Sequence, residues 1–118
     1  LQPAAVEPLD VRLPRDPRAL QIAVALLDDP SNPRSLVDWG REVGASVRTL
    51  SRLFNNETGE SFVQWRSRVR VRASLAQLAD GASVTSIARR VGYSTASSYV
   101  EAFRRWTGMT PLEYARRR

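Results

Sequence analysis

Apolar residues recur at spacings of three and four along the stretch from Ser61 to Asp80, which is the pattern of a helix. A shorter window, residues 66–72, alternates arginine with smaller residues and by itself would fit a strand, but the longer window favours the helix. Two apolar stripes run along it, made by Phe62, Trp65, Val69, Ala73 and Ala76 and by Val71, Leu75 and Leu78. A helix that is apolar on two sides is expected to pack against two partners.

Both ends of this stretch carry the signals of a helix boundary. Ser61 followed by Gln64 forms a capping-box pattern, in which each side chain satisfies a free backbone amide of the first turn. Gly81 follows the last periodic residue, where the left-handed backbone that ends many helices is favourable. We therefore predict a long helix in this stretch, roughly 27 Å in length for about 18 residues at about 1.5 Å each.

The sequences on the two sides of this helix repeat each other, at residues 35–59 and 83–108. They share a serine, an arginine, a valine–glycine pair and a second serine at one offset, then a phenylalanine, a threonine and a glycine after a one-residue insertion. Each copy predicts a helix, a short turn at Gly44 or Gly92, and a second helix. This is the helix-turn-helix arrangement.

The second helix of each copy is predicted to begin at a capping residue, Ser46 in the first copy and Ser94 or Thr95 in the second. Apolar spacing defines the buried face of each copy and leaves the opposite face outward. The residues expected to be buried are Leu36, Trp39, Gly40, Val43, Leu50, Leu53 and Phe54 in the first copy, and Val84, Ile87, Ala88, Val91, Tyr99, Ala102, Phe103 and Trp106 in the second.

Two further helices flank the repeats. Asp16 is a capping residue followed by proline, and it predicts a helix to about Asp28. The expected apolar face of that helix is Leu20, Ala23, Val24 and Leu27. Thr110, Pro111 and Glu113 form a second capping box with proline, which starts a short final helix.

These elements predict an all-α chain of about seven helices, with two helix-turn-helix subdomains joined by a long central helix. The expected organisation is 1–15 an extended linker or chain edge, 16–60 the first helix-turn-helix subdomain, 61–80 the connecting helix and 81–118 the second helix-turn-helix subdomain.

The composition excludes several classes of chemistry. The chain has neither cysteine nor histidine, which removes disulfides, thiolate or imidazole metal sites and the usual nucleophile–base pairs. We therefore expect no enzyme, no metal and no cofactor. No apolar run approaches the roughly 20 residues of a membrane span, so no membrane is expected. The lack of cysteine is compatible with a cytoplasmic protein, and the missing initiator methionine suggests a fragment of a longer chain.

The charge is positive and unevenly distributed. The net charge is +6, every basic residue is arginine, and residues 34–118 hold fifteen arginines against seven acidic residues. Such an excess favours a polyanionic partner, nucleic acid first. Successive major grooves on one side of DNA lie about 34 Å apart. A rigid helix of the predicted length, together with the width of each repeat, can place both second helices one turn apart.

The segments VGASVRTLSRLFNNETGESFVQW and SIARRVGYSTASSYVEAFRRWTGMTPLEYARRR resemble the DNA-binding domain of AraC/XylS-type bacterial transcription regulators. The resemblance covers about residues 18–117. It implies a homeodomain-like, AraC-type fold of seven helices whose two recognition helices enter adjacent major grooves of double-stranded promoter DNA. It further implies RNA polymerase as a partner and a separate effector-binding or dimerisation domain, commonly N-terminal, outside this chain.

Carried over residue by residue, the resemblance implies base readout by Val47, Arg48, Ser51, Arg52 and Asn55 in the first unit. The side chains of Arg48 and Arg52 suit bidentate bonding to guanine, and the alternatives for both are phosphate contact or simple solvation.

In the second unit the matching positions are Ala96, Ser97, Ser98, Val100 and Glu101, where family members often have longer amide or basic side chains. Ala96 and Val100 can contact thymine methyl groups, and Glu101 can accept from cytosine N4 but is repelled by phosphates. We therefore expect the first unit to read most of the sequence and the second to be weaker or mainly to position the protein.

Phosphate contacts are expected from backbone amides at helix starts and from arginines. The candidates are Ser35, Ser46, Ser83 and Ser94 for the helix starts, and Arg66, Arg89, Arg90, Arg104 and Arg105 for the side chains, with a solvated face as the alternative for each arginine. Arg70 matches a family arginine that we interpret as structural.

Trp39 and Gly40 depart from the usual leucine–alanine pair, and glycine inside a helix costs about 1 kcal/mol against alanine. We therefore expect the first unit to be somewhat loosened, with Trp39 filling the space.

Two other readings stay open, a helical protein-interaction module and a nonspecific nucleic-acid binder. Four aromatic residues could also be a base-stacking set, but their spacing on apolar faces favours core packing. They are Trp39, Trp65, Trp106 and Tyr114.

Overall fold

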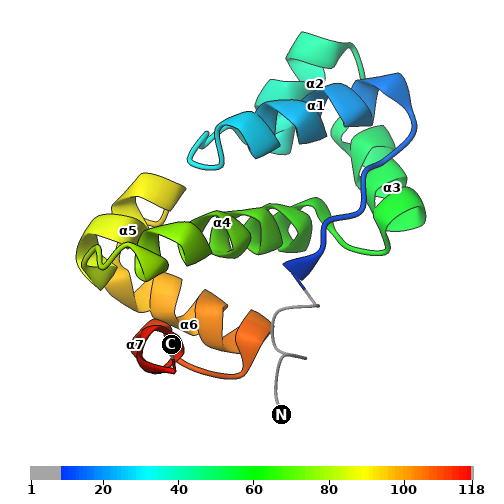
Figure 1. Ribbon diagram of the computed structural model, residues 1–118. Helices are drawn as coiled ribbons and strands as arrows, with labels where there is room; N and C mark the ends of the chain where they lie inside the picture. Colours follow the sequence, from blue (N-terminus) through cyan, green and yellow to red (C-terminus); the bar gives the residue numbers. More distant parts are fainter. Residues whose placement is uncertain (1–8, 118) are drawn as a thin grey trace.

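The computed structural model describes residues 9–117, which form seven helices and no strand. The helices are α1 (Pro17–Asp28), α2 (Leu36–Val43), α3 (Val47–Thr58), α4 (Phe62–Ala79), α5 (Val84–Val91), α6 (Ala96–Thr107) and α7 (Pro111–Arg116). Figure 1 shows α4 running between two groups of shorter helices, α1 to α3 on one side and α5 to α7 on the other. The predicted all-α architecture with a long central helix is confirmed.

Local capping accounts for where the helices begin. A serine or threonine hydroxyl accepts a backbone N–H of the first turn at Ser35, Ser46, Ser61, Ser83, Thr95 and Thr110. The capping box between Ser61 and Gln64 is present at the start of α4. Of the two residues proposed to cap α6, Thr95 is the one that does so, since its hydroxyl accepts from the amide of Ser98 at 3.0 Å.

Two separate cores lie on the two sides of α4, as its two apolar stripes predict. Phe62, Trp65 and Val69 of α4 pack into the first core, where Trp65 meets Phe54 edge to face at 5.5 Å. Val71 and Leu78 pack into the second core with residues of α5 and α6. The helix is therefore the shared wall of both units.

The prediction for the C-terminal end of the first apolar stripe of α4 was wrong. Ala73 packs against the second core, and Ala76 is exposed. The reason is that α4 extends beyond the helices of the first unit. Ala76 therefore lies in an open surface groove that Leu27 and Pro30, at the end of α1, also border.

The predicted face of α1 was also wrong in part. The buried residues are Ala19, Ile22, Ala23 and Leu26, whereas Val24 is 54% exposed. Nearly every position of α1 is apolar, so two overlapping stripes fit the spacing equally well. Tertiary packing against α2, α3 and α4 selects one of them.

Gly40 lies in close contact with the turn of the first helix-turn-helix. Its carbonyl accepts the amides of both Gly44 and Ala45, at 2.8 and 3.0 Å. A β-carbon on Gly40 would lie well inside 3.0 Å of the Ala45 carbonyl oxygen, closer than real β-carbons approach. The glycine therefore permits this tight turn, and the buried Trp39 packs in the first core beside it, as expected.

Residues 9–16, here called the N-terminal strap, pack against both units. Leu9 is buried in the second core, the carbonyl of Arg12 accepts from Nε1 of Trp65 at 2.8 Å, and the amide of Asp16 donates to Glu57 at 2.9 Å. The strap has almost no regular secondary structure, as expected for an extended segment. It nevertheless joins the two units, and the remainder of the predicted linker lies outside the described residues.

Within residues 9–117, no helix is both long enough and apolar enough to cross a membrane.

Candidate nucleic-acid interface

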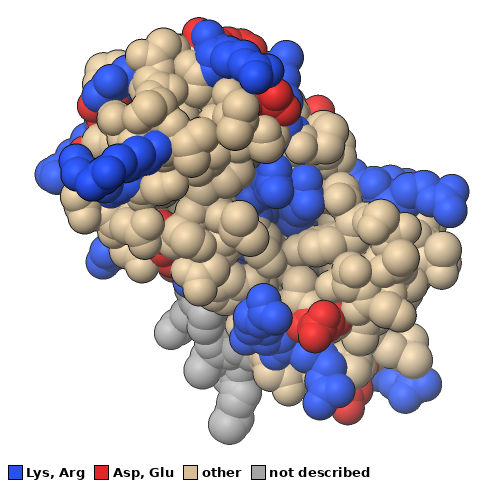
Figure 2. All heavy atoms as spheres, turned by 180° about the vertical axis from the view of Figure 1, so that it is seen from behind, with Lys and Arg blue, Asp and Glu red and all other residues tan. Residues whose placement is uncertain are grey.

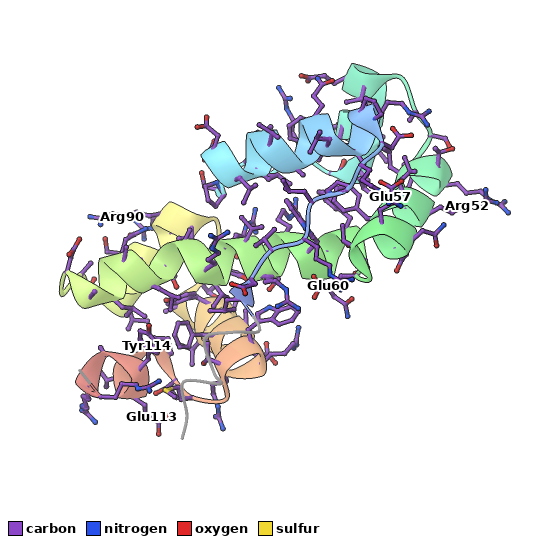
Figure 3. The ribbon with its side chains drawn as sticks, turned by 45° about the vertical axis from the view of Figure 1, so that its right-hand side comes forward. Arg52, Glu57, Glu60, Arg90, Glu113 and Tyr114 are labelled. Atoms are coloured by element: carbon purple, nitrogen blue, oxygen red, sulfur yellow. The ribbon has the colours of Figure 1, made fainter. Side chains whose placement is uncertain are left out.

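The outward face of α3 carries the side chains predicted to read bases in the first unit. Leu50 and Phe54 anchor the opposite face in the first core. Arg48 and Arg52 are exposed, and Figure 3 shows Arg52 pointing away from the body of the molecule. Val47 is 41% exposed at the start of the same helix.

Ser51 and Asn55, on the same face of α3, are more restrained than the arginines. Ser51 is partly buried. Asn55 donates its side-chain amide to the Ser51 carbonyl at 2.8 Å, which holds that side chain along the helix. The two arginines are therefore the longest groups that α3 presents to a ligand.

The outward face of α6 has a different chemistry. Ala96, Ser97, Val100, Glu101 and Arg104 line a shallow concavity, in which the partly exposed Val100 lies beside an exposed carboxylate. The hydroxyl of Ser98 accepts from the capping hydroxyl of Thr95 at 2.9 Å. This face thus offers short and apolar groups with one acid and one arginine, in contrast to α3.

Three of the four serines predicted to mark the starts of helices do cap a helix. Ser35, Ser46 and Ser83 cap α2, α3 and α5 and are exposed to solvent. Ser94 lies one residue before the cap of α6, so the amides at that end belong to the turn that Thr95 begins.

Four of the predicted phosphate-binding arginines extend from the second unit into solvent. Arg89, Arg90, Arg104 and Arg105 are all exposed, and none forms a salt bridge with another described residue. Figure 3 shows Arg90 leaving α5 at the opposite end of the molecule from Arg52. The second unit therefore carries unpaired positive charge along α5 and α6.

Arg66 is the exception among the predicted phosphate ligands. It donates to the carbonyl of Arg34 at 2.9 Å and its guanidinium lies 5.1 Å from the ring of Phe62. Burial lowers the pKa of Arg66. This arginine is therefore already held by the protein.

A pocket of about 210 Å³ lies between α4 and α6. Three arginines, Arg66, Arg70 and Arg105, share its lining with Tyr93 and Glu101. Figure 2 shows arginine side chains in the hollow between the two parts of the molecule. The connecting helix and the second unit therefore enclose a positively charged recess.

The half-buried Arg68 and the buried Arg70 contact parts of the chain that no spacing pattern could identify. Arg68 forms a bidentate ion pair with Glu60, in which both side chains are 17% exposed, and its guanidinium lies 4.4 Å from the ring of Trp106. Arg70 donates to carbonyls of the loop between α1 and α2, which agrees with its structural interpretation. Trp106, Pro30 and Asn32 are distant in sequence from these arginines, so only the folded chain reveals those contacts.

The aromatic residues belong to the cores, as predicted. Trp39 and Trp65 are buried in the first core, and Trp106 and Tyr114 pack against the second. The indole Nε1 of Trp106 also donates to Ser67 at 3.0 Å. This placement does not favour a base-stacking platform.

Comparison with known proteins identifies relatives of the chain. The family model described as a helix-turn-helix domain matches residues 39–117. The HTH-type transcriptional regulator RipA of Corynebacterium glutamicum is 39% identical over 102 residues, which cover 86% of this chain and 31% of that protein. The HTH-type transcriptional regulator NimR of Escherichia coli is 34% identical over 83 residues, 70% of this chain and 30% of that protein. The chain thus spans about a third of the length of these curated relatives.

Solved structures share the fold. The C-terminal domain of AraT, a response regulator from Geobacillus stearothermophilus, superposes with a TM-score of 0.81 at 25% identity, covering 87% of each chain. The DNA-binding domain of AdpA, a global transcriptional factor solved in complex with a target DNA, has a TM-score of 0.79 at 26% identity, covering 87% of this chain and 93% of that one.

Proposed function

Because the chain belongs to the AraC-type family of helix-turn-helix transcriptional regulators, whose members are DNA-binding proteins and not enzymes, we propose that it binds promoter DNA with α3 and α6 in adjacent major grooves. The observation that carries this proposal is the placement of two helix-turn-helix units on one continuous helix, each with one face of its second helix exposed to solvent. The AdpA domain of the same fold binds a target DNA.

The first unit carries most of the base readout in this proposal. Arg48 and Arg52 have the length and the fork of donors that suit guanine O6 and N7, and a good bidentate pair discriminates by about 1–3 kcal/mol. Both side chains are exposed and neither forms a salt bridge with another described residue. Val47, Ser51 and Asn55 make shorter contacts beside them.

The second unit mainly positions the protein, with secondary readout from α6. Ala96 and Val100 suit contact with thymine methyl groups. The carboxylate of Glu101 can accept from cytosine N4, whereas phosphates repel it. Ser97 and Ser98 are too short to reach far beyond the helix surface.

Phosphate contacts hold the two units on the duplex without reading sequence. The proposed contacts are the amides at the starts of α2, α3, α5 and α6, near Ser35, Ser46, Ser83 and Ser94, and the side chains of Arg89, Arg90, Arg104 and Arg105. Arg66 contributes through the charge of the recess it shares with Arg105.

The partners of the whole protein follow from the same family membership. The chain spans about a third of its curated relatives, and we assign the remaining length to an effector-binding or dimerisation domain on the N-terminal side. RNA polymerase is the proposed protein partner at the promoter, and the cytoplasm is the proposed location.

Selection of binding sites from random duplexes, followed by titration at several salt concentrations, tests the proposal. The expected result is an enriched site with two half-sites about one helical turn apart, and an affinity that falls about 10³-fold or more between 50 and 200 mM salt if six or more phosphates are contacted. A steep salt dependence without enrichment would identify a nonspecific binder. Little salt dependence would instead support a protein-interaction module.

A further inference from the structure

Arg70 lies at the junction of the two units. It contacts the first unit at the loop between α1 and α2. Its Nε donates to the carbonyl of Pro30 at 2.9 Å, and its NH2 group donates to the carbonyl of Asn32 at 3.2 Å. The residue is only 9% exposed, although it is charged. One side chain of α4 therefore holds the loop that precedes α2.

The other side of the same guanidinium faces the turn of the second unit. Its Cζ lies 5.6 Å from the ring of Tyr93. An ideal β-carbon on Gly92 would fall 2.7 Å from Cζ and 2.8 Å from Nε of Arg70. The absence of a side chain at Gly92 thus makes room for the guanidinium, which fills the space between one unit and the other.

Two other links join the units, the N-terminal strap with Leu9 in the second core, and Arg68 between Glu60 and Trp106. The larger helix–helix contacts among the described residues either stay within one unit or involve α4. A helix fixes the distance between its two ends, but rotation of a unit about that helix is limited by side-chain packing and by the N-terminal strap. Arg70 contacts both units and is placed where it would oppose such rotation.

The environment of Arg70 is a costly one for a residue with a purely stabilising role. The side chain forms no salt bridge with a described residue, and burial together with the nearby charge of Arg66 lowers the pKa of Arg70. Replacing buried charged groups by well-packed apolar ones is often neutral or stabilising. A role in fixing geometry explains why a guanidinium occupies this place.

We propose that Arg70 is a positioning residue that fixes the orientation of the second helix-turn-helix relative to the first, and thereby the half-site spacing that the protein accepts. The turn it contacts leads directly into α6, so a shift of Gly92 and Tyr93 moves the second recognition helix. The effect on spacing rests on the proposed DNA-binding function. The effect on orientation does not.

The first test measures affinity for duplexes with one half-site and with two half-sites at several separations. The Arg70→Met variant keeps an unbranched stem but loses every donor of the guanidinium. We expect its affinity at the best spacing to fall about tenfold, because a linked second contact loses effective concentration when its orientation is free. Its affinity for a single half-site should stay within about twofold of the unchanged protein.

Arg72→Met is the matched control, since it removes an exposed arginine from the same helix and changes the net charge equally. It should shift one-site and two-site affinities together and leave the spacing preference intact. Equal losses of one-site and two-site affinity in Arg70→Met, or an unchanged spacing profile, would overturn the proposal.

The second test needs no DNA. The chain has no cysteine, so spin labels at Val37→Cys on α2 and Thr85→Cys on α5, both exposed positions, report the distance between the units. We expect a narrow distance distribution in the parent and in Arg72→Met, and a broadened one in Arg70→Met. An unbroadened distribution would overturn the orienting role. A parent protein without any spacing preference would contradict the DNA-binding proposal while these distances still decide the role of Arg70.

Discussion

The guanidinium of Arg70 occupies the space that a β-carbon on Gly92 would need, 2.7 Å from Cζ to the ideal Cβ position. Gly92 also has a left-handed backbone, with φ of 109°. The corresponding glycine of the first unit, Gly44, has a φ of 75° and open space where its β-carbon would be. An arginine is therefore packed against the second of these equivalent turns and not against the first.

This difference predicts unequal effects of the same substitution. Gly44→Ala should lower the free energy of unfolding by about 1–2 kcal/mol, the cost of a left-handed alanine. Gly92→Ala should lower it by about 1–3 kcal/mol more, because it also displaces a buried side chain. Urea denaturation followed by circular dichroism measures both.

A double-mutant cycle isolates the contact between the two residues. In the Arg70→Met background the extra cost of Gly92→Ala should largely disappear, because a flexible thioether can move aside. Equal losses of unfolding free energy on Gly92→Ala in both backgrounds would show that the contact between Arg70 and Gly92 does not limit the side chain at position 92.

Gly40→Ala should destabilise the protein, although alanine is the better helix former. Helix propensity alone predicts a gain of about 1 kcal/mol. The new β-carbon would clash with the Ala45 carbonyl oxygen, and overpacking of this kind typically costs about 1–3 kcal/mol. Thermal unfolding measures the outcome. The exposed Ala76→Gly serves as a propensity reference and should cost about 1 kcal/mol, and a stabilised Gly40→Ala would contradict the tight-turn explanation.

Leu9→Ala tests whether the N-terminal strap is part of the second core. Leu9 is 2% exposed, so its truncation should lower the free energy of unfolding by about 2–5 kcal/mol. Leu13→Ala, in the same segment but at a residue 49% exposed, should cost well under 1 kcal/mol. Hydrogen exchange should show the loss of protection in α6 for Leu9→Ala, and similar effects of the two substitutions would argue against a packed strap.

Tyr99 predicts a loss of stability at alkaline pH. Its hydroxyl is buried without a hydrogen-bond partner among the described residues, since nearby Ser74 donates to the Val71 carbonyl, and burial raises the pKa of Tyr99 to about 12. The unfolded chain ionises first, near pH 10, so this contribution is complete below pH 10 and is lost as the pH rises towards 12.

The matched variant is Tyr99→Phe. The expected loss for the parent is about 2 kcal/mol between pH 10 and 12, and the variant should lack this part of the decline. At pH 7 the variant should be as stable as the parent or more stable, because an unsatisfied hydroxyl is removed. Denaturant midpoints measured across this pH range check both expectations, and parallel curves would show that Tyr99 does not control the alkaline transition.

Arg52→Ala tests base readout by the first unit. The variant should lose about 1–3 kcal/mol of preference for one base pair of the selected site. Its affinities for the four possible base pairs at that position should therefore become similar. Competition binding with duplexes varied at single positions measures this. Arg72→Ala supplies a charge-matched reference, and a uniform loss on every sequence would make Arg52 a phosphate contact.

The sequence was sufficient for the parts of the fold that local interactions determine. Helix boundaries followed from caps such as Ser61 and from left-handed glycines such as Gly92, because those signals act within a few residues. The outward face of α3 followed from the spacing of Leu50 and Phe54, since one buried stripe leaves only one face free.

What the sequence could not supply was the choice of partner. In α1 almost every position is apolar, and only the assembled unit selects Ile22 and Leu26 over Val24. The partners of Arg70 and of Leu9 lie far along the chain, where no periodicity connects them. The need for Gly40 likewise arises from a carbonyl that the turn brings back over the helix.

The burial of Leu9 in the same core as Tyr99 and Phe103 has a consequence for synthesis on the ribosome. Leu9 emerges before the residues of α6 that build the place it occupies. Leu9 must therefore remain without its final contacts until α6 has left the exit tunnel, so the domain is complete only after that point even though its first helices can fold earlier.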